Sequence, residues 1–178
     1  AAQVDQPLDL VIIATGTLHG NQSDVAYKTE KALSQLNSEA MSALFSVNTV
    51  GPALVLRYFA NKMRRDSSAV MAALSARVGS IGDNRLGGWY SYRASKAALN
   101  MVIKCASIEL ARRTPQLQVI SLHPGTVNTS LSQPFQAGVA PEKLFTPTRS
   151  ANALLDVIDN VMSDKEIVEK YSGLVGTG

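Results

Sequence analysis

The feature that most restricts the fold of this chain is an alternation of short β-branched runs with long amphipathic segments. Three runs, at residues 8–14, 69–74 and 117–122, are mostly apolar, as strands covered on both faces are. Each run is followed by a long segment with apolar residues at helical spacing. Parallel neighbouring strands need crossover connections, and helices usually supply them. The alternation predicts an α/β fold: a doubly wound parallel sheet with helices on both faces, in three α/β/α layers.

The predicted helices cover residues 38–63, 90–113 and 149–162. In the first of them, Ser38 is the expected N-cap, and Gly51 with Pro52 predicts an irregularity, because proline removes a backbone donor. The second runs without Gly or Pro. No repeat or linker divides the chain, so we expect one domain over residues 1–178.

Composition excludes several classes of function. The chain has 178 residues, 46% hydrophobic and 17% charged, which is typical of a globular domain. Its net charge of +3 comes from scattered residues, with Arg64–Arg65 and Arg112–Arg113 the only adjacent basic pairs. A nucleic-acid surface needs a denser basic stripe, so we expect no nucleic-acid partner. No unbroken apolar run approaches the roughly 18 residues of a membrane span, so we expect no membrane partner.

The single cysteine, Cys105, excludes an internal disulfide. With only two histidines beside it, the chain lacks the ligands of a structural zinc site, and no metal is expected. Cys105 is on an apolar helix face and is expected to be a buried structural thiol. These features, with no basic leader at the N-terminus, predict a reducing, cytoplasmic location.

Every distinctive polar cluster follows a predicted strand. The clusters are Thr15–Gly16, the Ser- and Gly-rich stretch 75–88, and residues 123–129. In open parallel sheets ligands bind beyond the carboxyl ends of the strands. A binding site is therefore predicted where these three clusters meet.

Tyr92 and Lys96 are four residues apart on the second predicted helix, and hence lie one turn from each other on the same face. A fixed positive charge favours a phenolate, so Lys96 is expected to lower the pKa of Tyr92 towards neutrality. Tyr92 could then give a proton to a carbonyl oxygen or take one from an alcohol. Alone, this spacing is common on solvated helix faces.

The whole stretch 90–100 (YSYRASKAALN) resembles the tyrosine helix of the short-chain dehydrogenase/reductase family. Tyr90 is a competing phenol, but no lysine follows it four residues on. The resemblance implies a Rossmann-type fold and NAD(P)-dependent hydride transfer between a carbonyl and an alcohol. It also implies that Tyr92 is the acid/base and that Lys96 binds the nicotinamide ribose.

Two further segments resemble family elements in the family's order. Residues 47–51 (VNTVG) resemble its Asn-x-x-Gly element, which implies that Asn48 holds a water on a proton relay. The residues alone equally allow Asn48 to repair a hydrogen bond of a helix interrupted at Gly51 and Pro52. Thr15–Gly16 correspond to the end of the family's Asn-Asn-Ala-Gly segment, although Ile13 and Ala14 replace the asparagines.

The segment 124–129 (PGTVNT) resembles the family's Pro-Gly segment, whose backbone meets the nicotinamide carboxamide. The residues that the resemblance assigns to the cofactor are Thr15, Gly16, Tyr92, Lys96, Pro124, Gly125, Val127 and Thr129. The cofactor is expected to be NADP or NAD, with a slight preference for NADPH. His123 is interpreted as a strand-end residue.

The family's substrate-binding serine has no direct counterpart. It stands three residues before a loop glycine, and three residues before Gly79 the chain has Ala76. Ser75 is the preferred candidate, but a slip of one residue in a strand reverses the side-chain direction. Either the strand end is bulged, or Ser80 takes over, or this hydrogen bond is absent.

The local sequence of residues 75–93 resembles that of the C-factor-like and sniffer-type carbonyl reductase branch. This implies a carbonyl reductase or alcohol dehydrogenase, with a non-catalytic signalling or dinucleotide-sensing protein as the alternative, since fold does not decide function. Phe135, Leu144 and Phe145, in a predicted lid at 134–148, predict a small apolar carbonyl or alcohol substrate. Relatives pair their two long helices, which implies a homodimer or homotetramer.

A complete family member has a Gly-x-x-x-Gly-x-Gly turn before the strand that matches residues 8–14, to let a helix N-terminus approach the pyrophosphate. This sequence has no such turn, and its glycine-rich stretch 173–178 is at the opposite end. We therefore expect a C-terminal portion of a Rossmann domain, incomplete at the N-terminus. A piece of a longer protein is preferred over a shortened, inactive relative, because a sheet lacking strands exposes an unpaired edge.

Overall fold

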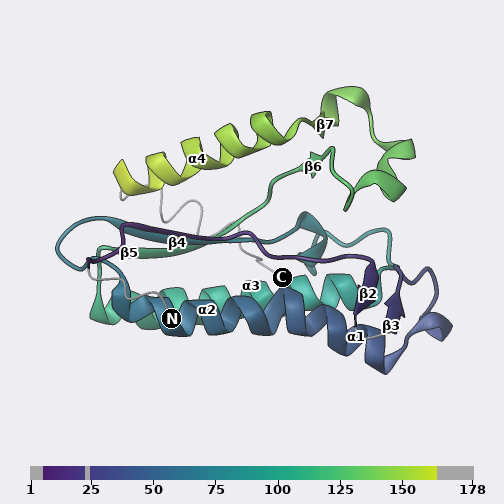
Figure 1. Ribbon diagram of the computed structural model, residues 1–178, viewed down its shortest axis with the longest axis horizontal. Coiled ribbons are helices and arrows are strands. Elements are labelled where there is room, and N and C mark those ends of the chain that lie inside the picture. The colour runs from purple at the N-terminus through teal and green to yellow at the C-terminus, as the bar shows by residue number, and fades with distance from the viewer. Residues whose placement is uncertain (1–5, 23–24, 164–178) are drawn as a thin grey trace.

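A parallel three-stranded sheet forms the centre of the molecule (Figure 1). The computed structural model describes residues 6–22 and 25–163. The strands are β1 (Leu10–Ile13), β4 (Ala69–Leu74) and β5 (Leu117–Leu122), in the order β1-β4-β5, and both pairings are parallel. The three strands predicted from sequence are confirmed, the first somewhat shorter than its apolar run.

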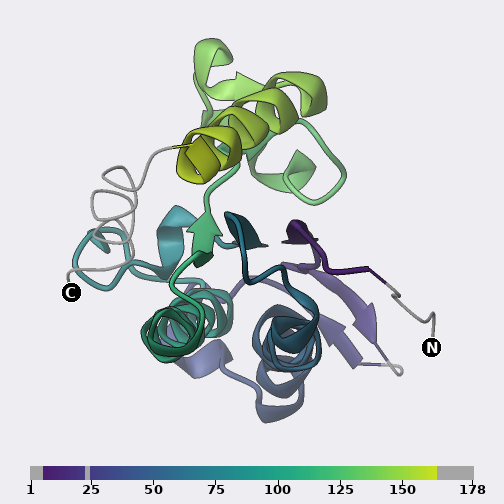
Figure 2. The same ribbon diagram turned by 90° about the vertical axis from the view of Figure 1, so that its left-hand side faces the viewer.

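Helices cover both faces of this sheet, which gives the three predicted layers (Figure 2). On one face lie α1 (Ser38–Phe45), α2 (Gly51–Phe59) and α3 (Tyr90–Arg113), and on the other lies α4 (Pro147–Ser163). Side chains alternate along a strand, so β4 sends Met71 to the core with α2 and α3, and Val70 to the core with α4. Residues 69–73 are almost completely buried because both faces are covered.

The first long helix is continuous but contains one wide turn. The π-helical segment η2 (Ser46–Val50) joins α1 to α2, and the Gly51 N–H bonds the carbonyl of Ser46, five residues back. The predicted irregularity is confirmed and lies just before Pro52, which has no N–H to continue the regular ladder. The N-cap is Asn37 and not Ser38 as predicted, because the Asn37 side chain accepts a hydrogen bond from Ala40 N at 2.8 Å.

Short elements that periodicity does not reveal complete the fold. An antiparallel hairpin joins β2 (Gly20–Gln22) and β3 (Val25–Tyr27), and β6 (Thr126–Val127) pairs in parallel with β7 (Leu144–Phe145). The 3₁₀ turns are η1 (Leu33–Gln35), η3 (Ala60–Lys62), η4 (Arg77–Gly79), η5 (Gln133–Gly138) and η6 (Pro141–Lys143). The predicted lid is therefore mostly η5, η6 and β7.

The outer face of the two long helices, opposite the sheet, carries exposed apolar side chains. Val50, Leu54 and Tyr58 are exposed on one helix, and Met101, Cys105 and Ile108 are exposed on α3. We call these six residues the outer helical face. Cys105 was expected to be buried, and this was wrong, because it points away from the side of α3 that carries the buried Leu99 and Ile103.

The first long helix is apolar as well as long. Residues 38–62 are long and apolar enough to cross a membrane, with a mean hydropathy of 1.3 in the best window. The expectation of no membrane partner rests on unbroken apolar runs and stays a prediction. In the structure, Leu56 and other residues of this helix pack against the sheet, as in the core helix of a globular domain.

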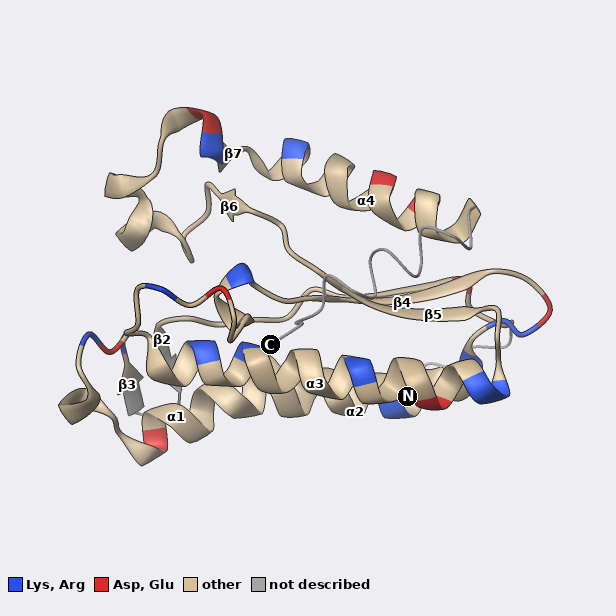
Figure 3. Ribbon diagram, turned by 180° about the vertical axis from the view of Figure 1, so that it is seen from behind, with Lys and Arg blue, Asp and Glu red and all other residues tan. Residues whose placement is uncertain are grey.

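Charged side chains are scattered over the helices and loops (Figure 3). Arg112 and Arg113 are exposed in the last turn of α3, where the helix dipole favours cations.

Candidate functional site

Helix α3 places Tyr92 and Lys96 one turn apart on its buried side. Tyr92 is 9% exposed and Lys96 is 3% exposed. The helix comes very close to the loop after β4: a Cβ atom on Gly79 would lie 2.9 Å from the Cβ of Lys96. This contact leaves room only for glycine, so the sequence of the loop fixes how near the tyrosine helix approaches the strand end.

Three elements meet at the ammonium group of Lys96. A Cβ atom on Gly16, just after β1, would lie 3.4 Å from Lys96 Nζ and 3.6 Å from Asn48 Oδ1. Lys96 Nζ also donates a 2.8 Å hydrogen bond to the carbonyl of Leu74 at the end of β4. The structure thus brings Gly16, Asn48 and Lys96 together, while Thr15 beside them is exposed.

The carboxamide of Asn48 connects these elements. Its Oδ1 accepts from Thr17 N at 2.8 Å, and its Nδ2 donates to Thr17 O at 2.8 Å and to Ser95 Oγ at 3.1 Å. Ser95 Oγ in turn donates to the carbonyl of Tyr92 at 2.8 Å. Asn48 is completely buried and bonds to two other elements, so it does not repair a hydrogen bond of its own helix.

Burial shifts the two titratable groups in opposite directions. Desolvation raises the pKa of Tyr92 from 10.0 to about 12 and lowers the pKa of Lys96 from 10.5 to about 8. The expected lowering of the Tyr92 pKa by Lys96 is therefore wrong, because the cost of burying a phenolate outweighs the nearby ammonium. At neutral pH the site holds a neutral phenol and a charged lysine.

Both serine candidates form hydrogen bonds with groups other than Tyr92. Ser75 is buried, and its hydroxyl donates to Asn100 Oδ1 at 2.6 Å, while Ser80 Oγ accepts from Asp83 N at 3.3 Å. Ala76 follows in extended conformation, so its side chain points the opposite way from Ser75. Ala76 packs with the apolar cluster that contains Tyr92.

An aromatic cluster that sequence patterns did not indicate adjoins Tyr92. The ring of Trp89 lies 6.3 Å from that of Tyr92 and 4.7 Å from that of Phe135 in η5. His19, after β1, lies 5.8 Å from Phe135, and its Nε2 is 3.0 Å from the carbonyl of Leu131. The predicted lid therefore rests on Trp89 and on the segment after β1.

The Pro-Gly segment is held by the elements that follow it. Gly125 has a φ of +76°, and a Cβ there would lie 2.5 Å from the ring of Phe145. Ser150 Oγ donates to the carbonyl of Pro124 at 2.7 Å. Val127 is half-buried in β6, and Thr129 is exposed at the end of this segment.

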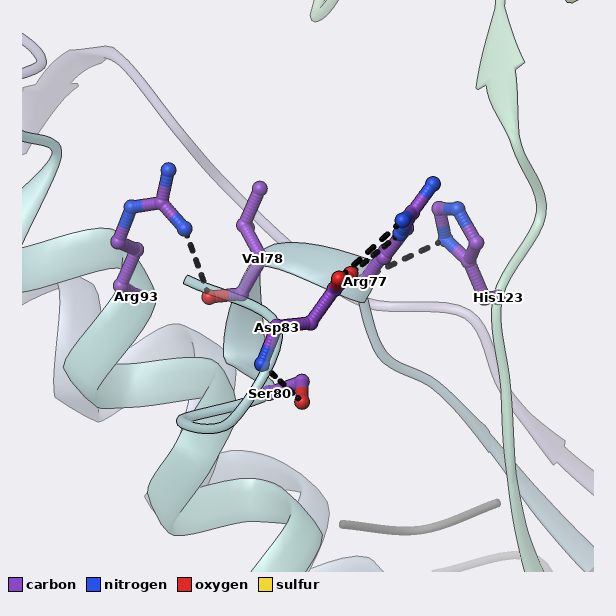
Figure 4. A network of polar contacts seen from close by, with 6 residues as sticks. All are labelled: Arg77, Val78, Ser80, Asp83, Arg93 and His123. Atoms are coloured by element: carbon purple, nitrogen blue, oxygen red, sulfur yellow. Dashed lines mark hydrogen bonds and ion pairs between the residues drawn. The ribbon is translucent and has the colours of Figure 1, made fainter. Parts of the chain in front are cut away.

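The loop after β4 is fixed by a polar network (Figure 4). Arg77 pairs with Asp83, and the Arg77 backbone N–H donates to His123 Nδ1 at 3.3 Å. Desolvation of the imidazole, and then the nearby Arg77, lower the pKa of His123, although the residue as a whole is exposed. His123 thus links the ends of β4 and β5, in keeping with its interpretation as a strand-end residue.

Comparison with known proteins identifies the family. Residues 1–140 match the family model described as short chain dehydrogenase, so the chain belongs to the short-chain dehydrogenase/reductase family. C-signal of Myxococcus xanthus is 33% identical over 130 residues, which are 73% of this chain and 73% of that protein. This confirms the resemblance to the C-factor-like branch.

Solved structures agree with this family assignment. The NADPH-bound carbonyl reductase from chicken fatty liver is 28% identical, with a TM-score of 0.70 over 88% of this chain and 60% of that one. The carbonyl reductase Sniffer of D. melanogaster is 25% identical, with a TM-score of 0.66 over 87% and 60%. The doubly wound Rossmann-type fold is thereby confirmed. Other curated relatives are covered over only 53% and 58% of their length.

The depressed pKa of Lys96 makes stability depend on pH. The unfolded lysine titrates near 10.5 and the folded one near 8, so the unfolded state binds more protons between these values. The free energy of unfolding should therefore rise from about pH 8 to pH 10, below the range in which Tyr92 titrates. Urea unfolding should show this rise in the wild type and lose it in Lys96→Met. Lys104→Met, at an exposed position of α3, should keep it.

Proposed function

We propose that this chain carries the acid/base site of an NAD(P)-dependent carbonyl reductase or alcohol dehydrogenase. The observation that supports this most is the meeting of Lys96 Nζ, the Asn48 carboxamide and the bare backbone of Gly16, one helical turn from the buried Tyr92. Family membership gives the reaction class, and this arrangement gives its residues.

The site leaves room for a nicotinamide cofactor at Gly16, where any side chain would obstruct the approach to Lys96 and Asn48. Gly16 presents no Cβ towards Lys96 and Asn48, so a ribose hydroxyl could approach the ammonium from the exposed side of Gly16. Thr15, Gly125, Val127 and Thr129 would supply the remaining contacts, with Pro124 setting the turn. When bound, the cofactor supplies or accepts the hydride. NADPH is favoured because the chicken carbonyl reductase is described as bound to it.

Tyr92 acts as the proton donor in the direction of carbonyl reduction. With its pKa raised to about 12, the phenol is neutral at physiological pH and can give its proton to the developing alkoxide. Lys96, charged below about pH 8, stabilises the phenolate that remains and orients the ribose. Asn48 holds the strand-end backbone against α3, where a relay water would bind.

The cluster around Tyr92 favours an apolar carbonyl compound. Ala76, Val78, Trp89 and Phe135 pack against the buried cluster that contains Tyr92 and supply apolar surface. Such surface binds hydrocarbon parts of a substrate, while the Tyr92 hydroxyl meets its oxygen.

Tyr92→Phe should abolish turnover. Removing a general acid costs about 100-fold or more in kcat. The measurement is oxidation of NADPH with 4-nitrobenzaldehyde, an electron-poor carbonyl compound that accepts hydride readily. Tyr90→Phe is the matched control and should keep wild-type turnover, because no lysine follows Tyr90 one turn on.

Turnover that survives in Tyr92→Phe would contradict this assignment. The C-signal relative favours a second candidate, a non-catalytic signalling or dinucleotide-sensing protein. Binding of NADPH seen by nicotinamide fluorescence, without turnover of any carbonyl in the wild type, would support that candidate instead.

The serine geometry leads to a separate expectation. Ser75 is engaged with Asn100, so Ser75→Ala should change kcat little, by about two-fold or less. Ala76→Ser should place a hydroxyl in the Tyr92 cluster. It should raise kcat by about ten-fold, because a hydrogen-bond donor aimed at the developing oxyanion stabilises the transition state. A large loss of kcat in Ser75→Ala would instead indicate that Ser75 forms the hydrogen bond to the substrate oxygen.

We further propose a homodimer, or a dimer of dimers, formed by the outer helical face, in a reducing cytoplasm that keeps the exposed Cys105 thiol free. Apolar residues on adjacent helices form a surface that a second copy can cover. Leu54→Glu should convert the protein to monomer in sedimentation at micromolar concentration. Leu155→Glu, equally exposed at 44% but on α4, should remain associated. A monomeric wild type would contradict the proposal.

A further inference from the structure

A buried carboxylate from a distant segment contacts the first turn of the tyrosine helix. Glu30 is 5% exposed. Its Oε1 accepts a hydrogen bond from Ser91 Oγ, and its Oε2 accepts one from Ser91 N at 3.3 Å. Its backbone carbonyl accepts from Trp89 N at 2.6 Å. Glu30 therefore holds the residues on which α3 begins, 61 positions away from Ser91 in the sequence.

The start of α3 needs such a contact. Trp89, the residue before the helix, has a left-handed conformation with φ at +51°, and its side chain makes no capping hydrogen bond. Gly87 and Gly88 before it also have positive φ, at +63° and +64°. Three successive left-handed residues turn the chain sharply into the helix, and the free N–H groups of its first turn require acceptors.

Glu30 supplies these acceptors with the charge that a helix start favours. A carboxylate at the N-terminus of a 24-residue helix interacts favourably with the helix dipole. Ser91 is completely buried and immediately precedes Tyr92. Its two hydrogen bonds to one carboxylate therefore fix the backbone from which the Tyr92 ring projects.

We infer that Glu30 is a positioning residue for Tyr92: through Ser91 it sets the place and the burial of the phenol. The inference rests on the proposed function only for its catalytic meaning, since the contact itself involves no cofactor or substrate. Glu30 does not touch the reacting atoms, so it is not a catalytic residue. The carboxylate instead makes the acid's environment depend on the segment between β3 and α1.

The ionisation of the Tyr92 phenol can be followed directly by a ¹³C NMR pH titration of the full chain labelled at the tyrosine Cζ. Buried wild-type Tyr92 should titrate near 12, well above its ordinary 10.0. Glu30→Ala should loosen the first turn, admit water and move the Tyr92 midpoint towards 10.0. Glu30→Gln keeps the shape and one acceptor but loses the charge, so it should give an intermediate midpoint. Ser91→Ala should resemble Glu30→Ala.

Asn37→Ala is the matched control. Asn37 caps α1 through Ala40 N, so this variant also uncaps a helix but one without Tyr92. It should lower the melting temperature and leave the Tyr92 midpoint unchanged. An unchanged midpoint in folded Glu30→Gln and Ser91→Ala would overturn the inference, because Glu30 would then merely stabilise the fold.

Turnover separates this inference from the proposed function. If the function holds, Glu30→Gln should lower kcat several-fold with KM for NADPH and 4-nitrobenzaldehyde unchanged. If Tyr92→Phe keeps full turnover, the proposed function fails, while a shifted Tyr92 midpoint in the Glu30 variants would still establish the positioning contact.

Discussion

The hydrogen bonds of the Asn48 carboxamide are the interaction on which the rest of the site depends. They join the segment after β1 to the tyrosine helix, by way of Thr17 and Ser95. An amide can do this because it donates and accepts at once, and burial makes each bond costly to lose. Asn48 lies within the wide turn at residues 46–50, and π-helical turns of this kind frequently occur at functional sites.

Burial also determines the chemistry of the site. Both Tyr92 and Lys96 lie where water is largely excluded, and the same desolvation favours a neutral phenol and disfavours an ammonium. The lysine keeps its charge at neutral pH because its shift leaves it near 8. In the reaction proposed above, this protonation state allows Tyr92 to donate a proton in reduction. The reverse reaction would require a phenolate that this environment disfavours.

Much of the framework could be predicted from the sequence because its signals are local. The runs at 69–74 and 117–122 carry the pattern of strands covered on both faces, and Tyr92 with Lys96 lie within one helix. The contacts between distant segments were beyond such reasoning. Nothing near Glu30 in the sequence indicates that it meets Ser91, and the direction of Ser75 depends on one residue of register. The exposure of Cys105 likewise depends on which face of α3 meets the sheet. Apolar residues occur on more than one side of this helix, so its sequence does not reveal that face.

Trp89 is the only tryptophan of the chain, and its indole lies between the tyrosine ring and the lid. The protein therefore contains its own optical probe at the site. Ultraviolet emission comes chiefly from this one indole, whose surroundings include Phe135 of η5 on one side and Tyr92 on the other. A ligand that displaced the lid would change the polarity around the indole, and its binding would then change the intrinsic fluorescence without a label.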